Sequence, residues 1–241
     1  MLITKFQFLI VGDRSNSVIK MLVDNKTIQN SDTVYLLGIT LDSNLNLLPH
    51  VTNMCKSVNQ RTNALNRIRG NISQEKATRL ANSFILSIFN YCPLIWMFCN
   101  KTANTLINTS HKRALRVILG DSEISFEEAL AVTGSKSLHY RNLELLMVEV
   151  YKSINSLNPA FMFDIFSKKI TSYSFRAGNI LKPPKIDGNM RFISLNSLAL
   201  RSTLAWNMLP KLLKECENIL KFKSDVKSIK IYCQCKICCY F

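Results

Sequence analysis

The chain has 241 residues, of which 47% are hydrophobic and 20% are charged. This composition excludes an intrinsically disordered protein and predicts a folded core, in one large domain or two small ones. Lysine and arginine outnumber aspartate and glutamate by 31 to 16, which gives a net charge of +15. Such an excess predicts a negatively charged partner.

Secretion and membrane insertion are not expected. The N-terminal residues lack the basic start and the long apolar run of a secretory signal. The most apolar window, residues 84–98, is 15 residues long and is interrupted by Asn90 and Pro93, whereas a membrane helix needs about 20 apolar residues. The eight cysteines are clustered rather than spread as a disulfide framework. We therefore expect an intracellular protein of the cytoplasm or nucleus, with reduced thiols and no membrane contact.

The first 48 residues predict a short antiparallel β-element. Alternating apolar residues at 5–11 indicate a strand, and residues 18–23 and 26–28 flank a turn at Asp24 and Asn25. Residues 34–41 indicate a third strand, with Gly38 inside it. Because glycine weakens a strand interior, it marks a close approach by another backbone or a ligand.

Residues 49–119 predict basic helices. Apolar residues at helical spacing indicate helices at 49–69, from Ser73 to about Asn90, and at 102–119. This region holds ten basic side chains and one acid, Glu75. The charge favours a polyanion-binding surface over the alternative, a solvated basic face. The side chains expected on this surface are Lys56, Arg61, Arg67, Arg69, Lys112, Arg113 and Arg116, with the last three exposed.

Residues 120–241 predict further helices. Ser125 and Glu128 fit a capping box, and helices are expected at 137–156, 195–208 and 220–229, with a basic connector at 167–192. Trp96 and Trp206 are expected in the core because apolar residues surround both. The predicted fold class is therefore mainly α (α+β), with a short antiparallel β-element at the N-terminus, a helical bundle and a cysteine-rich tail.

The tail is the candidate metal site. Thiolates are good zinc ligands, and close spacing lets one turn present several of them to one ion. A closed site normally uses two separated pairs of ligands, however, so a thiol-rich tail without metal is an open alternative. The candidate ligands for Zn²⁺ are Cys233, Cys235, Cys238 and Cys239.

No catalytic arrangement is recognised. His50, His111 and His139 do not assemble by spacing, and each is predicted to be solvated or to cap a helix. No nucleophile with a nearby histidine, no glycine-rich phosphate loop and no adjacent pair of aspartates is present in the sequence. The residues alone therefore predict no active site.

Six segments follow one another in the order of a known family. They are residues 5–12 (KFQFLIVG), 36–42 (LLGITLD), 89–99 (FNYCPLIWMFC), 111–118 (HKRALRVI), 206–210 (WNMLP) and 233–238 (CQCKIC). As an ordered set, the chain resembles the carboxyl-terminal part of reverse transcriptases from LINE-type (non-LTR) retrotransposons of the jockey-like group.

The resemblance implies a role for each region. Residues 1–48 would be a remnant of the polymerase palm, in which Lys5 closes a late strand–turn motif and Leu37, Gly38 and Ile39 form the primer grip. Residues 49–119 would be the thumb, and residues 120–241 a carboxyl-terminal region that ends in the cysteine motif. The family's catalytic aspartates precede the segment that matches residues 5–12, so Met1 is expected to lie inside a longer reading frame.

The leading hypothesis is a fragment of an RNA-directed DNA polymerase that binds an RNA/DNA template–primer but is inactive by itself. Mg²⁺ would belong only to the missing palm site, and the palm and fingers of a longer element protein are possible partners. The alternatives are a degenerate gene product and a helical or zinc-dependent interaction module that binds nucleic acid.

Overall fold

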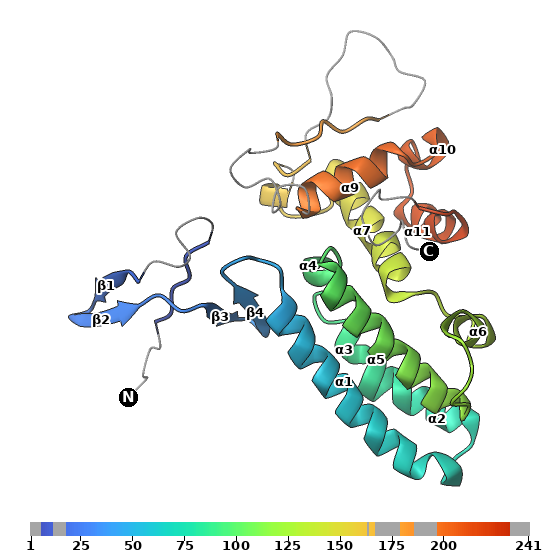
Figure 1. The fold of residues 1–241 in the computed structure, drawn as a ribbon. Coiled ribbons are helices and arrows are strands. Elements are labelled where there is room, and N and C mark those ends of the chain that lie inside the picture. The colour runs from blue at the N-terminus through green and yellow to red at the C-terminus, as the bar shows by residue number, and fades with distance from the viewer. Residues whose placement is uncertain (1–5, 12–17, 163, 167–178, 186–196, 232–241) are drawn as a thin grey trace. The chain divides into compact units, whose positions relative to one another are not determined.

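The computed structural model describes residues 6–11, 18–162, 164–166, 179–185 and 197–231 (Figure 1). The chain divides into two compact units. Unit 1 comprises residues 1–91 and 99–129, and unit 2 comprises residues 92–98 and 130–241. The fold is mainly helical after a short antiparallel β-element at the N-terminus, as predicted. The division expected at residues 48 and 119 stays a prediction.

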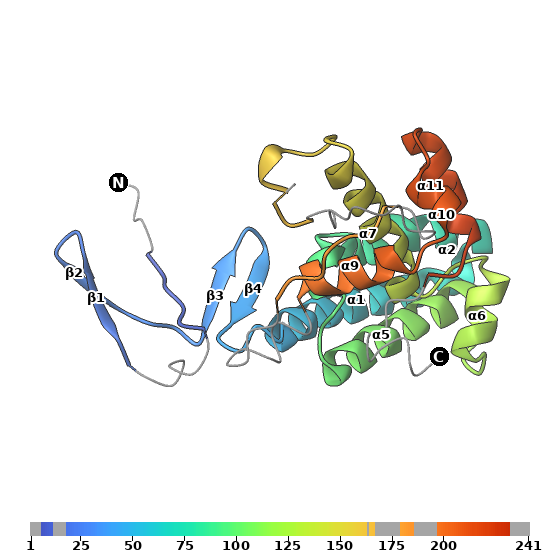
Figure 2. The same cartoon turned by 90° about the horizontal axis from the view of Figure 1, so that it is seen from above.

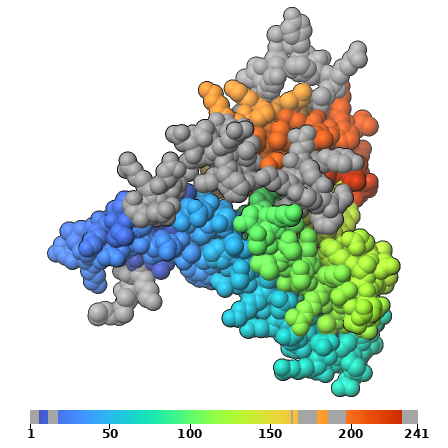
Figure 3. Space-filling model, in the orientation of Figure 1, coloured from blue at the N-terminus to red at the C-terminus, as the bar shows by residue number. Residues whose placement is uncertain are grey.

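Two separate hairpins form the β-element. Strand β1 (Lys20–Val23) pairs with β2 (Lys26–Gln29), and β3 (Thr33–Leu36) pairs with β4 (Ile39–Asp42). Asp24 and Asn25 both have positive φ, which is the geometry of the tight turn that joins twisted strands. The first predicted hairpin is thus confirmed. Seen from above, β3 and β4 lie at the start of α1 (Figure 2), and the space-filling view shows the blue residues of the hairpins beside that helix (Figure 3).

Two strand predictions are wrong. Residues 34–41 are not one strand, because the chain reverses at Leu37 and Gly38 and pairs Leu36 with Ile39. Residues 6–11, the described part of the segment expected at 5–11, do not form a strand. Among the described residues, one backbone hydrogen bond, from the Ser31 N–H to the Phe8 carbonyl at 3.0 Å, joins this segment to the others, which is too little for a ladder.

The helices of unit 1 form where the apolar spacing predicts them. They are α1 (Leu48–Ile68), the 3₁₀ turn η1 (Arg69–Asn71), α2 (Gln74–Ala81), the π-helical turn η2 (Asn82–Leu86), α3 (Ser87–Phe89) and α5 (Lys101–Leu119). Ser73 and Asn100 cap α2 and α5 by accepting from backbone N–H groups. The buried stripe of α1 packs along α5 (Figure 1). Helix α6 (Phe126–Val132) follows, with the predicted capping box between Ser125 and Glu128.

Unit 2 has its own core. Its elements are α4 (Pro93–Trp96), α7 (Leu138–Ile154), η3 (Ala160–Met162), α9 (Leu198–Asn207), α10 (Lys211–Lys214) and α11 (Ile219–Ser228). The Tyr151 and Phe222 rings stack with centroids 4.4 Å apart, and Trp206 lies 6.0 Å from Phe222. Trp96 and Trp206 are both fully buried, so their prediction as core residues is confirmed. Within the described ranges, no helix is long and apolar enough to cross a membrane.

Candidate nucleic-acid interface

The turn between β3 and β4 has an unusual composition for its geometry. Leu37 has φ 45° and Gly38 has φ 83°. This left-handed pair matches the turn type that favours Asn-Gly, because leucine is disfavoured at positive φ. The Leu37 side chain is also 83% exposed. The turn therefore holds a large apolar side chain in solvent on a disfavoured backbone.

Tyr91, which follows α3, holds this turn from outside the sheet. Its hydroxyl donates to the Leu37 carbonyl at 2.6 Å. A Cβ at Gly38 would lie 3.0 Å from Tyr91 Cε1, closer than side chains ordinarily pack. Gly38 is therefore required both by its φ and by the tyrosine ring. The close approach predicted at this glycine exists, although the approaching group is a side chain of the same chain.

The hairpin is fastened to the start of α1 by two further contacts. The Asp42 carboxylate, which is buried, accepts from the backbone N–H of Leu47 at 2.7 Å and of Asn46 at 3.2 Å. The Thr40 N–H donates to His50 Nδ1 at 3.5 Å. Burial lowers the pKa of His50, which favours the neutral imidazole that can accept this bond. These contacts fix the direction of the hairpin relative to α1.

The histidines were expected to be solvated or capping, and the structure corrects this. All three are buried, His50 and His139 at 8% exposure and His111 at 2%. The His111 ring lies edge-on to Phe89 and Phe126, with centroids 6.0 and 5.5 Å apart. Each of the three histidines has apolar residues one helical turn away, so it lies on the buried face of its helix.

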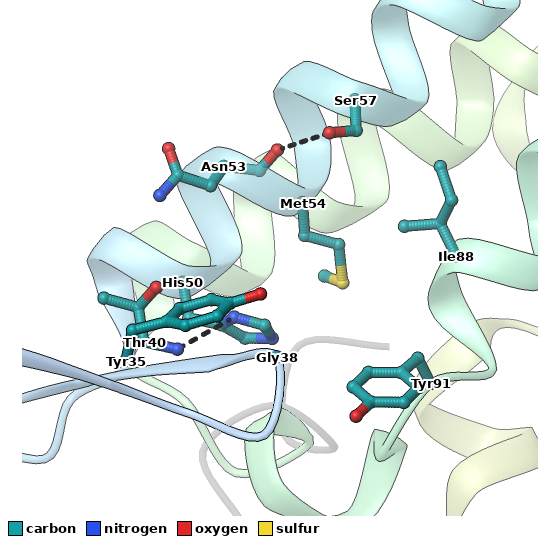
Figure 4. Close-up of a pocket in the computed structure, with 9 residues that line it drawn as sticks. All are labelled: Tyr35, Gly38, Thr40, His50, Asn53, Met54, Ser57, Ile88 and Tyr91. Atoms are coloured by element: carbon teal, nitrogen blue, oxygen red, sulfur yellow. Dashed lines mark hydrogen bonds between the residues drawn. The ribbon is translucent and has the colours of Figure 1, made fainter. Parts of the chain in front are cut away.

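A pocket lies between the hairpin, the first turns of α1 and the end of α3 (Figure 4). Its volume is about 360 Å³. Tyr35 and Tyr91 contribute aromatic rings, while Met54 and Ile88 contribute apolar surface (Figure 4). The remaining lining residues are Gly38, Thr40, His50, Asn53 and Ser57.

One exposed face of α1 carries two of the predicted basic residues. Lys56, Gln60, Asn63 and Arg67 are spaced by four, three and four residues and are all exposed. This spacing places them on one side of the helix. We call this set the α1 polar face. Lys56 and Arg67 thus have the exposure that phosphate contact requires.

Two more predicted arginines are tied to neighbouring elements of unit 1. Arg61 Nη1 donates to the Phe84 carbonyl in the π-helical turn η2 at 2.6 Å. Arg113 Nη2 of α5 donates to Asn63 Oδ1 on the α1 polar face at 2.7 Å. Both arginines remain exposed. Each therefore has a fixed position while its charge still faces solvent.

The guanidinium groups of Arg69 and Arg116 are half-buried and donate hydrogen bonds to backbone carbonyls. Arg69 Nε donates to the carbonyls of Val117 and Ile118 at 3.1 and 3.2 Å, where α5 ends. Arg116 Nε donates to the Ile124 carbonyl at 3.0 Å. The expected full exposure of residues 112, 113 and 116 holds for Arg113 alone, since Lys112 and Arg116 are half-buried. The spacing of residues in the sequence does not reveal that an arginine side chain will donate to backbone carbonyls at or beyond the end of a helix.

Several predicted site residues lie outside the described residues. They are Lys5 and the candidate zinc ligands Cys233, Cys235, Cys238 and Cys239. In the parts of the chain that the structure describes, no three histidine, cysteine or acidic side chains gather as metal ligands.

Sequence reasoning missed Tyr35, Asn53 and Tyr91 as members of the site. The signal for Tyr91 is its position just after the second predicted helix, in the segment 89–99 that resembles the family. The sequence holds no local pattern that pairs Tyr91 with Leu37, because 54 residues separate them. Comparison of the chain with family models, with curated proteins and with solved structures finds no match.

Proposed function

We propose that this chain is part of the reverse transcriptase of a LINE-type retrotransposon and binds template–primer nucleic acid. In this proposal the β3–β4 turn contacts the primer strand, and the basic helices of unit 1 contact phosphates. The observation that carries the proposal is Leu37, which is 83% exposed at φ 45°. Strained backbone of this kind persists where function requires it and concentrates at ligand contacts.

The charge of residues 49–119 supports the same proposal. Glu75, the one acid in residues 49–119, pairs with Arg79 at 2.6 Å. The fixed arginines donate instead to carbonyl and amide oxygens, as Arg61 and Arg113 do. Neutral acceptors hold a guanidinium in place without cancelling its charge. The surface keeps its positive potential, and a polyanion is the partner that such a potential attracts.

The proposal is tested by the salt dependence of binding. The full chain is titrated into a fluorescein-labelled RNA/DNA template–primer, and the dissociation constant is measured by anisotropy between 50 and 300 mM NaCl. Each phosphate contact contributes roughly 0.9 to the slope of log K against log salt. We expect the double variant Lys56→Gln, Arg67→Gln to reduce the slope by about two. A wild-type chain that shows no salt dependence would contradict the proposal.

The matched control removes the same charge from the other unit. Lys221 and Lys223 are exposed on α11, and their double replacement by glutamine is expected to change the slope less. The pair Lys56→Arg, Arg67→Lys retains both charges and should restore the wild-type slope. Primer extension with the purified chain and Mg²⁺ is expected to yield no product, since the catalytic aspartates are assigned to another segment of the polymerase.

An interaction module is the second candidate, and the β1–β2 hairpin favours it. Met21 and Leu22 are 48% and 68% exposed on adjacent positions of β1, so both faces of this hairpin present apolar side chains. A two-stranded hairpin with apolar side chains on both faces needs cover from another element, which would be a larger palm sheet in the first proposal and a protein partner in this one. Absence of nucleic-acid binding at 50 mM NaCl, together with association in sedimentation velocity, would favour this second function.

A further inference from the structure

The pocket beside the β3–β4 turn has the size of a small-ligand site. Its volume of about 360 Å³ lies at the lower end of the range for pockets that hold small organic groups. The pocket is bounded by three elements of unit 1, which are the hairpin, the first turns of α1 and the end of α3 (Figure 4). Leu37, the proposed primer contact, is the residue next to its Gly38 wall.

The lining favours a neutral occupant over a charged one. None of the nine lining residues is an aspartate, glutamate, lysine or arginine. His50, the lining imidazole, has a lowered pKa because it is buried and accepts from the Thr40 N–H. A phosphate inside the pocket would meet no cationic lining side chain to balance its charge. A neutral group therefore fits the pocket better than a phosphate does, and the exposed cations of the basic helices are the better phosphate contacts.

The lining matches a flat ring with polar edges. Tyr35 and Tyr91 are 69% and 51% exposed, so each ring offers surface to an incoming group. The sulfur-containing chain of Met54 forms an adaptable apolar surface between them (Figure 4). Asn53 and Thr40, whose side chains carry amide and hydroxyl groups, are also among the lining residues. A ring that carries hydrogen-bonding groups in its own plane fits this combination.

We infer that this pocket takes one unpaired nucleobase of the strand held at the hairpin turn, stacked on Tyr35. The inference rests on the proposed function, because the neighbouring phosphates are what bring a base to the pocket. An unpaired end is the expected source, since extracting a base from a duplex costs the energy of its stacking and pairing. Tyr91 serves as a positioning residue, because its hydroxyl holds the Leu37 carbonyl.

The test compares two template–primers that differ in one base. Both carry a single unpaired nucleotide at the primer 3′ end, which is deoxyadenosine in one probe and an abasic deoxyribose in the other. The phosphates are identical, so electrostatic binding cancels in the comparison. Stacking of a base on an aromatic side chain predicts roughly tenfold tighter binding of the full chain to the adenine probe. Tyr35→Ala should lower its affinity to that of the abasic probe, and Tyr35→Phe should retain most of the difference.

The matched control is Phe161→Ala in unit 2, because Phe161 is also 69% exposed. This variant should keep the tenfold difference. A second measurement does not depend on folding of any variant. With 2-aminopurine as the unpaired base, wild-type chain should quench its fluorescence at saturation, as stacking requires.

The outcomes separate the two proposals. Equal affinity for the two probes with intact salt dependence, or unchanged 2-aminopurine fluorescence at saturation, would overturn the pocket inference and leave the nucleic-acid function standing. Failure of wild-type chain to bind either probe at 50 mM NaCl would overturn both.

Discussion

Replacement of Leu37 by asparagine is expected to stabilise the protein. A leucine in the left-handed region costs about 1–2 kcal/mol, whereas asparagine tolerates it. The side chain is 83% exposed, so the apolar burial lost on replacement is worth only about 0.3 kcal/mol. The replacement also places Asn-Gly, the preferred pair, at this turn. The expected net gain in the free energy of unfolding is about 1 kcal/mol.

Urea unfolding followed by far-ultraviolet circular dichroism measures this gain. With an m-value of about 3 kcal/mol/M, the midpoint should rise by about 0.3 M. Leu37→Ala is the matched control, because it removes the same apolar surface but keeps a side chain that is disfavoured at positive φ. It should give no gain. Equal stability of the asparagine and alanine variants would refute the argument that the Leu37 backbone is strained.

The same two variants separate strain from contact in binding. If the leucine side chain touches the primer strand, both variants should bind the template–primer more weakly than wild type, although one is more stable. Strain that is retained for function produces this opposition between stability and activity. A more stable asparagine variant with undiminished affinity would remove Leu37 from the proposed contact surface.

Three further changes probe how the hairpin is fastened. Tyr91→Phe removes the hydroxyl that donates to the Leu37 carbonyl at 2.6 Å. It should lower the free energy of unfolding by about 1 kcal/mol and speed hydrogen exchange of the β4 amides. Unchanged exchange would show that the bond does not hold the turn. Asp42→Ala leaves the Leu47 N–H unpaired and should lower the free energy of unfolding in urea by about 1–3 kcal/mol. Asp42→Asn keeps an acceptor oxygen and should lower it less. Equal losses for the two variants would count against this acceptor role. His50, whose pKa is lowered from 6.5 by burial, binds a proton in the unfolded state more readily than in the native state. Stability should therefore fall as pH drops below about 6.5 and stay level above it, and His50→Gln should reduce this fall between pH 7 and 5; identical pH profiles would contradict the effect.

The helices could be predicted because their signal is local. Apolar residues at helical spacing placed α1 and α5 within a residue or two, and Ser73 and Ser125 marked helix starts. Such patterns depend on residues one turn apart, which a sequence displays directly.

The site depended on contacts that no local pattern contains. Strand-forming residues stand on both sides of the two-residue reversal at 37–38, so the hairpin looked like one strand. The clasp by Tyr91 and the anchoring of Arg69 on the end of α5 connect residues 54 and 48–49 positions apart. An arginine is partly buried where neighbouring elements present backbone carbonyls that its guanidinium can donate to. The positions of those carbonyls follow from packing rather than from residue type.

The interleaved order of the two units has a consequence for biosynthesis. Unit 1 is interrupted by residues 92–98, which belong to unit 2, and resumes at residue 99 with α5. Helix α1 packs along α5, so a ribosome that has released only the first 98 residues has released an incomplete core. The nascent chain must wait for α5 before unit 1 can close. A nonsense codon between the two helices would therefore remove α5 and leave the core of unit 1 incomplete, whereas truncation after residue 129 would leave the whole of unit 1 in the chain.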